Sequence, residues 1–392
     1  MPPVSPRRLL SIAAAALVLA PSASAAPHTL VVGAAEATSQ VPDIAVAKAK
    51  MDLAQLAGLG AIRLAATWPA GQTQPDPEAL VGLKNAVAAA DLDAIQTIVA
   101  LDHGGAKFTP TTPLSRAQYA AWAGNLAHEL PTVRTFIVGN EPNLNRFWMP
   151  QFGGRGADAA ATAYEALLAK TYDALKTVSP SIQVIGGALS PHGADKPRAP
   201  RQTHSPTRFL LDLAQVYRRS RRAKPIMDAF ALHPYNDSSL TPPTVAHPHS
   251  TTITLADYQK LVALLKTAFR GTAQPGAKLP IVYAEYGIQT QIPSDKLSAY
   301  TDLRALGAFD AVPEAVQGAY YSKAIRMAFC QTTVRTLLFF HVSDEADLDR
   351  WQSGLFYADD TPKSDLSTVK LAVDAARAGT LTCKRFPAKT RR

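Results

Sequence analysis

The segment FIVGNEPN, residues 136–143, is a short apolar run that leads through Gly139-Asn140 to a glutamate, Glu141. A second segment, IVYAEYG at residues 281–287, has the same form and leads to Glu285. Each run is typical of a strand buried in a sheet, and each stops at a carboxylate. An ionised group gains nothing from packing there, because burying it without a partner costs free energy. The two glutamates therefore indicate one acid/base site to which two strands contribute.

Short apolar runs rich in Val, Ile and Leu recur along the chain, as expected for strands buried on both faces. Eight strands are predicted, at residues 29–32, 61–65, 95–100, 134–138, 183–187, 228–232, 280–284 and 336–341. Helical spacing of apolar residues follows each strand, at residues 44–56, 77–90, 116–130, 164–178, 208–222, 255–269, 313–329 and 366–378. Eight strand–helix repeats predict an α/β protein, a single-domain (β/α)8 TIM barrel. A doubly wound open sheet is the alternative, but no glycine-rich phosphate loop follows the first strand.

The N-terminus has the features of a secretory signal. Arg7 and Arg8 precede an apolar run at residues 9–20, which is too short to span a bilayer of about 30 Å. Small residues at 23–25 then suit cleavage. We therefore expect a signal peptide at residues 1–25 and a catalytic domain at residues 26–392, with an uncleaved membrane anchor as the alternative.

The chain has two cysteines, Cys330 and Cys383. In an oxidising compartment two cysteines most simply form one disulfide, which would join the tail to the last helix before the final strand. Two free thiols are the alternative.

The formal net charge is +9, and much of the excess lies in two basic clusters, at residues 218–224 and 384–392. Lysine and arginine at a helix C-terminus suit the helix dipole, so a solvated surface is the simpler interpretation. A surface for an anionic polymer is the alternative. No aromatic residues are interleaved as a stacking platform for nucleic acid would require, so we expect no nucleic acid partner.

Polar and aromatic side chains follow the predicted ends of six strands. They are Arg63 and Trp68, Asp102 and His103, Asn140 to Trp148, His233 to Asn236, Glu285 and Tyr286, and His341 with Trp351. Because parallel barrel strands end on one face, these side chains should converge where barrel enzymes build their sites.

This arrangement resembles the clan A glycoside hydrolases, which include the cellulase-like family 5 and the xylosidase-like family 39. Asn140-Glu141-Pro142 matches the clan's Asn-Glu-Pro at the end of strand four. The resemblance implies that Glu141 is the acid/base, that Asn140 binds the sugar 2-hydroxyl, and that Glu285 on strand seven is the nucleophile.

The resemblance also implies roles for the residues around the two glutamates. Arg63 matches an arginine beneath the nucleophile, and His233-Pro234-Tyr235 matches a strand-six segment that orients it. His103 matches a histidine on strand three. For Arg63 a barrel-closing ion pair is the alternative, and for His233 a buried core position.

These assignments fit the chemistry of retaining cleavage, which needs two carboxyl groups about 5–5.5 Å apart. One must attack as the anion, and Arg63 with a donor from His233 or Tyr235 would keep it charged. The other must hold a proton.

Trp148 and Trp351 offer flat faces for sugar rings, with core packing as the alternative for each. Many clan members end strand eight with a tryptophan that floors the sugar site, whereas this chain has His341 there. Either the following loop folds Trp351 back to the sugar site, or the floor of that site differs from the one in those clan members.

The sequence therefore predicts a secreted, retaining glycoside hydrolase that cleaves O-glycosidic bonds of an oligo- or polysaccharide by double displacement. A transglycosylase and a non-catalytic carbohydrate-binding barrel are the alternatives. We expect a monomer that needs no cofactor or metal and, after signal cleavage, contacts no membrane.

Overall fold

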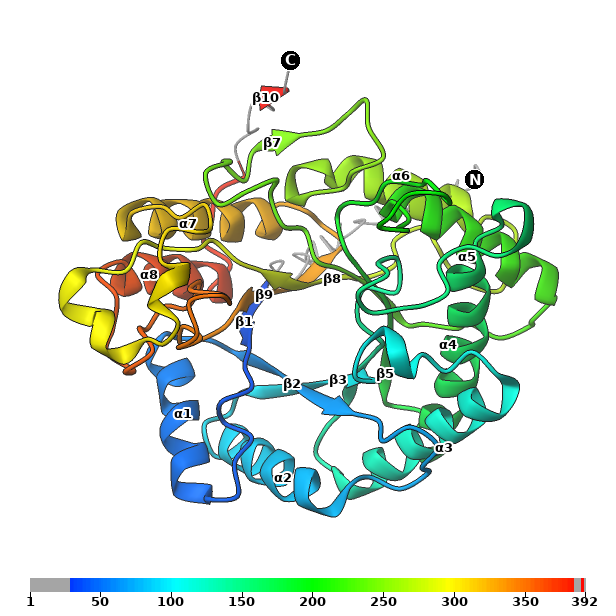
Figure 1. Ribbon diagram of the computed structural model, residues 1–392, viewed down its shortest axis with the longest axis horizontal. Coiled ribbons are helices and arrows are strands. Elements are labelled where there is room, and N and C mark those ends of the chain that lie inside the picture. The colour runs from blue at the N-terminus through cyan, green and yellow to red at the C-terminus, as the bar shows by residue number, and fades with distance from the viewer. Residues whose placement is uncertain (1–28, 384–388, 391–392) are drawn as a thin grey trace, which may run out of the picture.

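The eight predicted strands form one closed parallel barrel in the computed structural model, which describes residues 29–383 and 389–390 (Figure 1). The barrel strands are β1 (Val31–Ala35), β2 (Ala61–Thr67), β3 (Gln96–Asp102), β4 (Thr135–Val138), β5 (Gln183–Leu189), β6 (Ala229–Leu232), β8 (Ile281–Tyr286) and β9 (Val334–Phe340). Each pairs with the next, and β9 closes the barrel by pairing with β1. The predicted (β/α)8 fold is confirmed, and the predicted signal peptide lies outside the described residues.

The predicted helices form a ring around the barrel (Figure 1). They are α1 (Ile44–Leu56), α2 (Pro77–Leu92), α3 (Pro113–Glu129), α4 (Ala159–Val178), α5 (Pro206–Ser220), α6 (Tyr258–Ala268), α7 (Glu314–Phe329) and α8 (Leu366–Arg377). Short 3-10 helices lie at η1 (Ala106–Phe108), η2 (Gly154–Gly156), η3 (Leu255–Asp257), η4 (Ser294–Ala299) and η5 (Leu303–Ala305).

Some helix boundaries differ from prediction because polar caps fix them. Asp158 accepts a hydrogen bond from Ala161 N at 2.7 Å, so α4 begins five residues before the predicted start at 164. The predicted helix at 255–269 is divided into η3 and α6.

A pair of two-residue strands that was not predicted, β7 (Val245–Ala246) and β10 (Lys389–Thr390), lies outside the barrel.

The core has two layers because strand side chains alternate between the two faces of the sheet. A large cluster packs between strands and helices, and a smaller one consists of residues at alternating strand positions, such as Ile98 and Ala100 on β3 or Val282 and Ala284 on β8. The smaller cluster therefore fills the barrel interior, with alanines among the larger Ile, Val and Leu side chains.

Cys330 and Cys383 form a disulfide with a Cα–Cα distance of 5.4 Å. It joins the end of α7 to the segment that follows α8, as predicted. Within the described residues, no helix has the length and apolar character needed to span a bilayer.

Candidate active site

The catalytic candidates lie at the C-terminal ends of the barrel strands, where strand geometry aims them at the barrel axis. On β2, Ala61 belongs to the interior cluster, so Arg63 two residues later points the same way. On β8, regular alternation after Val282 and Ala284 would turn Glu285 outward. The β8–β9 register shifts between Tyr283 and Tyr286, and such an irregularity can re-aim a side chain. Glu285 accordingly lines the central cavity.

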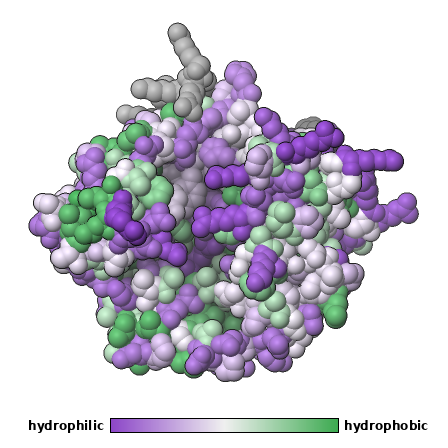
Figure 2. All heavy atoms as spheres, in the orientation of Figure 1, coloured by the Kyte–Doolittle hydropathy of each residue, from purple (hydrophilic) through white to green (hydrophobic). Residues whose placement is uncertain are grey.

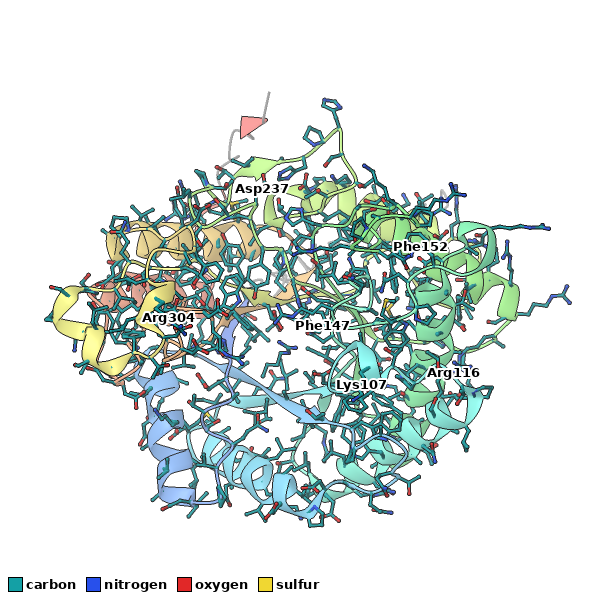
Figure 3. The ribbon with its side chains drawn as sticks, viewed as in Figure 1. Lys107, Arg116, Phe147, Phe152, Asp237 and Arg304 are labelled. Atoms are coloured by element: carbon teal, nitrogen blue, oxygen red, sulfur yellow. A yellow bond between two sulfur atoms is a disulfide. The ribbon has the colours of Figure 1, made fainter. Side chains whose placement is uncertain are left out.

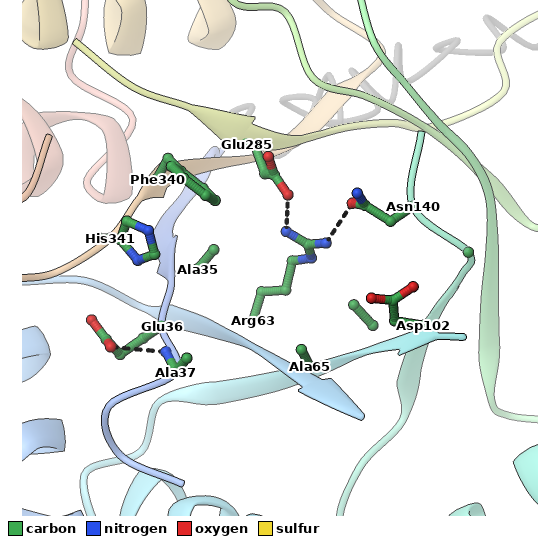
Figure 4. Close-up of a pocket in the computed structure, with 12 residues that line it drawn as sticks. Ala35, Glu36, Ala37, Arg63, Ala65, Asp102, Asn140, Glu285, Phe340 and His341 are labelled. Atoms are coloured by element: carbon green, nitrogen blue, oxygen red, sulfur yellow. Dashed lines mark hydrogen bonds and ion pairs between the residues drawn. The ribbon is translucent and has the colours of Figure 1, made fainter. Parts of the chain in front are cut away.

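Arg63 connects the ends of two strands (Figure 4). Its Nη1 donates to Glu285 Oε1 at 2.5 Å, and its Nη2 donates to Asn140 Oδ1 at 3.2 Å. Arg63 and Glu285 are each only 8% exposed. The ion pair is thus shielded from solvent, and Arg63 both bridges the barrel interior and contacts the predicted nucleophile.

The segment after β6 brings two more side chains to the glutamates. Tyr235 OH donates to Glu285 Oε2 at 3.0 Å. His233, fully buried, has its Nδ1 3.1 Å from Glu141 Oε1 and 3.4 Å from Glu285 Oε2. Those two oxygens therefore lie no further apart than the sum of the two distances, about 6.5 Å. One histidine nitrogen thus lies within 3.4 Å of both carboxyl groups.

The surroundings of Glu285 favour its charged form. Burial would raise the pKa of Glu285, but the charges of His233 and Arg63 and the hydrogen bonds from Arg63 and Tyr235 outweigh it and lower the pKa below the ordinary value. Burial, with the charge of Glu285, raises the pKa of Tyr235 well above its usual value. Tyr235 therefore remains a protonated donor to a carboxylate acceptor.

Glu141 lies in a turn that is fixed to the neighbouring strand. Its backbone has φ of 39°, which is unusual for a residue with a side chain, and its N–H donates to Ala188 O at 2.9 Å. Asn143, fully buried, accepts from Ser190 N at 3.0 Å and donates to His204 O at 2.9 Å. These bonds hold the turn to the loop after β5, a role for Asn143 that the sequence did not indicate.

The loop after β9 folds Trp351 back to the site. Its ring lies 5.2 Å from that of Tyr235 and 5.4 Å from that of Phe340, and it is partly exposed. This contact resolves the alternatives left by the absence of a tryptophan at 341. His341 itself lines the cavity with φ of 83°. Burial alone would lower the pKa of His341, but Glu345, whose Oε2 lies 3.5 Å from Nε2, and Glu36 raise it.

Two predicted substrate-binding side chains do not reach the cavity. Trp148 is fully buried and His103 is 1% exposed, with their rings 5.3 Å apart. Trp148 N donates to Leu144 O, so the chain turns inward, and the indole packs against Tyr164 of α4. The expected sugar platform at Trp148 is therefore core packing, and the His103 ring packs on it.

The cavity at the strand ends has a volume of about 200 Å³. Figure 2 shows a hollow at the centre of this face, bordered mostly by hydrophilic residues, and Figure 3 shows labelled residues of the surrounding inserts, including Lys107, Phe147 and Asp237. The lining residues are Ala35, Glu36, Ala37, Arg63, Ala65, Ala100, Asp102, Gly139, Asn140, Glu285, Phe340 and His341. Within the described chain, no group of three or more His, Cys, Asp or Glu side chains is arranged to hold a metal ion.

Two lining carboxylates, Glu36 and Asp102, were given no catalytic or substrate-binding role from the sequence, although Asp102 was expected on this face. Glu36 accepts from Ala37 N at 2.8 Å and from Val342 N at 3.2 Å, so it ties the end of β1 to the loop after β9. Asp102 ends β3 in the inward row of Ile98 and Ala100. The alternation of strand side chains was the available signal for Asp102.

Among known proteins, this chain is similar only in fold to solved structures. No family model matches, and no curated protein matches. Solved structures do match in fold. A family 39 glycoside hydrolase from Bacteroides cellulosilyticus has a TM-score of 0.62 at 18% identity, over 90% of this chain and 64% of that one. This chain therefore spans less than two thirds of that protein's length.

Two further structures are similar in the same way. A family 5 subfamily 18 protein from Streptomyces cattleya, solved with GlcNAc, has a TM-score of 0.59 at 17% identity, over 90% of this chain and 81% of that one. A β-xylosidase from Caulobacter crescentus has a TM-score of 0.56 at 15% identity, over 87% and 67%. Sequence identities this low establish similarity of fold only. In fold, the predicted resemblance to clan A glycoside hydrolases is confirmed.

Proposed function

We propose that this chain is a retaining glycoside hydrolase in which Glu285 is the nucleophile and Glu141 the acid/base. The observation that carries the proposal is the position of His233 Nδ1, 3.1 Å from one glutamate and 3.4 Å from the other. The resulting limit of about 6.5 Å between those oxygens fits the 5–5.5 Å of retaining enzymes better than the roughly 6.5–9.5 Å of inverting ones. The similar solved structures, which are named as glycoside hydrolases, a xylosidase and a mannosidase, support the same reaction class.

In the first step Glu285 attacks the anomeric carbon while Glu141 gives its proton to the leaving oxygen. The C1–O bond to the leaving group breaks, and a bond from C1 to Glu285 forms. The lowered pKa of Glu285 supports its role as the attacking anion. Asn140 accepts from Arg63 through Oδ1, so its amide N–H groups are left to donate to the sugar 2-hydroxyl.

In the second step water replaces Glu285 at the anomeric carbon. Glu141, now a carboxylate, takes a proton from that water, and the bond between C1 and Glu285 breaks with Glu285 leaving as the anion. Each glutamate returns to its starting state. Inversion at both steps gives net retention.

The substrate is proposed to be an oligo- or polysaccharide. Trp351, partly exposed beside Tyr235, offers an apolar ring face next to Glu285 on which a sugar can pack. We also propose that the protein is exported and acts as a monomer. The basic and apolar N-terminal residues and the Cys330–Cys383 disulfide support export.

The test measures product release from a panel of plant and microbial polysaccharides and aryl glycosides by wild type, Glu141→Gln and Glu285→Gln. Wild type should release sugar, and both variants should lose at least about 100-fold in kcat while still binding substrate. Proton NMR of the first product should show the anomer of the substrate. An inverted anomer would contradict retention.

The same panel separates the competing functions. Products longer than the substrate, formed when an acceptor sugar is added, would indicate a transglycosylase. Binding without cleavage by any of the three proteins would indicate a carbohydrate-binding barrel and overturn the proposal.

A further inference from the structure

Asp102 is a carboxylate at the cavity for which the two-glutamate mechanism has no role. It is the last residue of β3, and it lines the cavity together with Asn140 and Glu285. Side chains alternate along a strand. Since Ile98 and Ala100 fill the barrel interior, Asp102 faces the axis and His103 faces away from it.

The height of Asp102 in the barrel suits contact with a bound sugar. Arg63 on β2 pairs in register with Ile98 on β3, and Asp102 lies four residues beyond Ile98. At a rise of about 3.3 Å per residue, the Asp102 backbone is about 13 Å further along the strand than that of Arg63. Arg63 reaches up to Glu285 from below, whereas Asp102 lies at the mouth beside the end of β4.

One oxygen of the Asp102 carboxylate accepts a hydrogen bond within the protein, and the other can accept one from a ligand. Its Oδ1 accepts from the His103 N–H at 2.7 Å, which fixes the side chain. In the part of the chain that the structure describes, Oδ2 has no hydrogen-bond partner and is not among the buried unpaired atoms. Figure 4 shows the carboxylate on the Asn140 side of the cavity, across Arg63 from Glu36 and His341.

We infer that Asp102 is the residue that recognises the 3-hydroxyl of the sugar bound over Glu285. This inference rests on the proposed function, which sets C1 at Glu285 and the 2-hydroxyl at Asn140. Asn140 follows β4, and Asp102 ends the neighbouring strand β3. The next ring carbon after C2 therefore faces Asp102, and its hydroxyl can donate to Oδ2.

Asp102 thus takes the substrate-binding role that was predicted for His103. That ring is 1% exposed and packs on Trp148, with Nδ1 3.1 Å from Gly105 O. It cannot reach a ligand in the cavity. A consequence concerns substrate class: the sugar over Glu285 needs a free 3-hydroxyl, so interior units of 3-linked polymers are excluded.

The test compares Asp102→Ala and Asp102→Asn with wild type on the best-cleaved aryl glycoside and on its 3-deoxy counterpart. Asp102→Ala should lower kcat/KM about 10- to 100-fold on the parent, the effect of losing a hydrogen bond to a charged group. On the 3-deoxy substrate it should change kcat/KM less than about threefold, because that bond is already absent. Asp102→Asn keeps the acceptor for the His103 N–H and serves as the folding check.

Asp91→Asn, an exposed charge change at the end of α2, is the matched control and should match wild type on both substrates. Equal losses on parent and 3-deoxy substrates would overturn the inference by indicating a structural role for Asp102. So would wild-type kcat/KM in Asp102→Ala.

A binding measurement separates this inference from the proposed function. NMR saturation transfer would compare Glu285→Gln with Glu285→Gln/Asp102→Ala, using D-glucose, D-mannose and D-xylose as probes. Binding that is lost only in the double variant supports the role of Asp102 even if wild type cleaves no glycoside. Equal binding by both proteins, or none by either, overturns it.

Discussion

Arg63 illustrates how one residue can serve both structure and chemistry. As an ion pair inside the barrel it bridges β2 to β8, and as a neighbour of Glu285 it helps to lower that group's pKa. Because the pKa of Glu285 is depressed, its charged form stabilises the fold above the unfolded pKa of about 4.3. That contribution is lost as pH falls through the folded pKa. The two alternatives predicted for Arg63 are thus compatible.

We expect Arg63→Gln to raise the pKa of Glu285, since an opposite charge nearby lowers a carboxyl pKa by about 1–3 pH units. Glu285 must be ionised to attack, so the acidic limb of kcat/KM against pH should move to higher pH by a similar amount. Arg304→Gln, at a side chain 94% exposed, is the control and should leave the limb in place. If the acidic limb of Arg63→Gln lies at the same pH as that of wild type, Arg63 does not control the charge state of Glu285.

The structure brings predicted site residues together where backbone position alone decides the contact. Arg63 and Glu285 lie within β2 and β8, and Asn140 and Glu141 directly follow β4, so the closed barrel brings all four together. Trp148 and Trp351 both follow strand ends, yet one is buried and the other partly exposed. The path of an irregular loop depends on its tertiary contacts, and no periodicity in the sequence encodes it.

At the scale of elements, all eight barrel strands were predictable because buried parallel strands are short, continuous and apolar. The exact ends of the strands were less predictable. The predicted eighth strand runs to His341, but β9 stops at Phe340, and His341 takes a left-handed backbone conformation. The β8 register shift that re-aims Glu285 also had no sequence signal, because it depends on the pairing with β9.

Close strand contact makes a glycine necessary on β1. A Cβ at Gly33 would lie 2.2 Å from the carbonyl oxygen of Ala61 on the paired strand β2. We expect Gly33→Ala to lower the free energy of unfolding by about 1–3 kcal/mol or more, as overpacking does. Denaturant titration measures it. Gly154→Ala, where a Cβ meets nothing within 4 Å, is the control, and an equal effect of both substitutions would refute the contact argument.

For the whole molecule, the basic cluster at 218–224 can be placed relative to the cavity, whereas most of the cluster at 384–392 lies outside the described residues. The basic cluster at 218–224 follows the C-terminal end of α5, which leads into β6 and so lies at the opposite end of the barrel from the cavity. Arg222 pairs with Asp173 at 2.6 Å, and Arg218 donates to Ala268 O at 3.0 Å. Part of the excess charge thus has intramolecular partners, which composition could not indicate.

The disulfide acts on the same remote end. Cys330 caps α7 just before β9 begins, so the bridge lies at the N-terminal end of the strands, away from Glu141 and Glu285. It spans 53 residues, a loop for which chain entropy predicts about 4 kcal/mol of stabilisation. Cys330→Ser/Cys383→Ser should therefore lower the thermal midpoint by several degrees and leave kcat/KM at 25 °C within about twofold of wild type.

Reduction of the wild type with dithiothreitol is the control and should give the same midpoint as the double variant. Loss of kcat/KM without a change in the thermal midpoint would show that the bridge acts on the site. An unchanged midpoint with unchanged kcat/KM would show that packing of α8 against α7 and β1 already fixes the C-terminal segment without the covalent bond. Loss of kcat/KM alone would show that the disulfide end of the barrel influences the catalytic end. The predicted result instead shows that the disulfide contributes to stability without affecting catalysis at the opposite end.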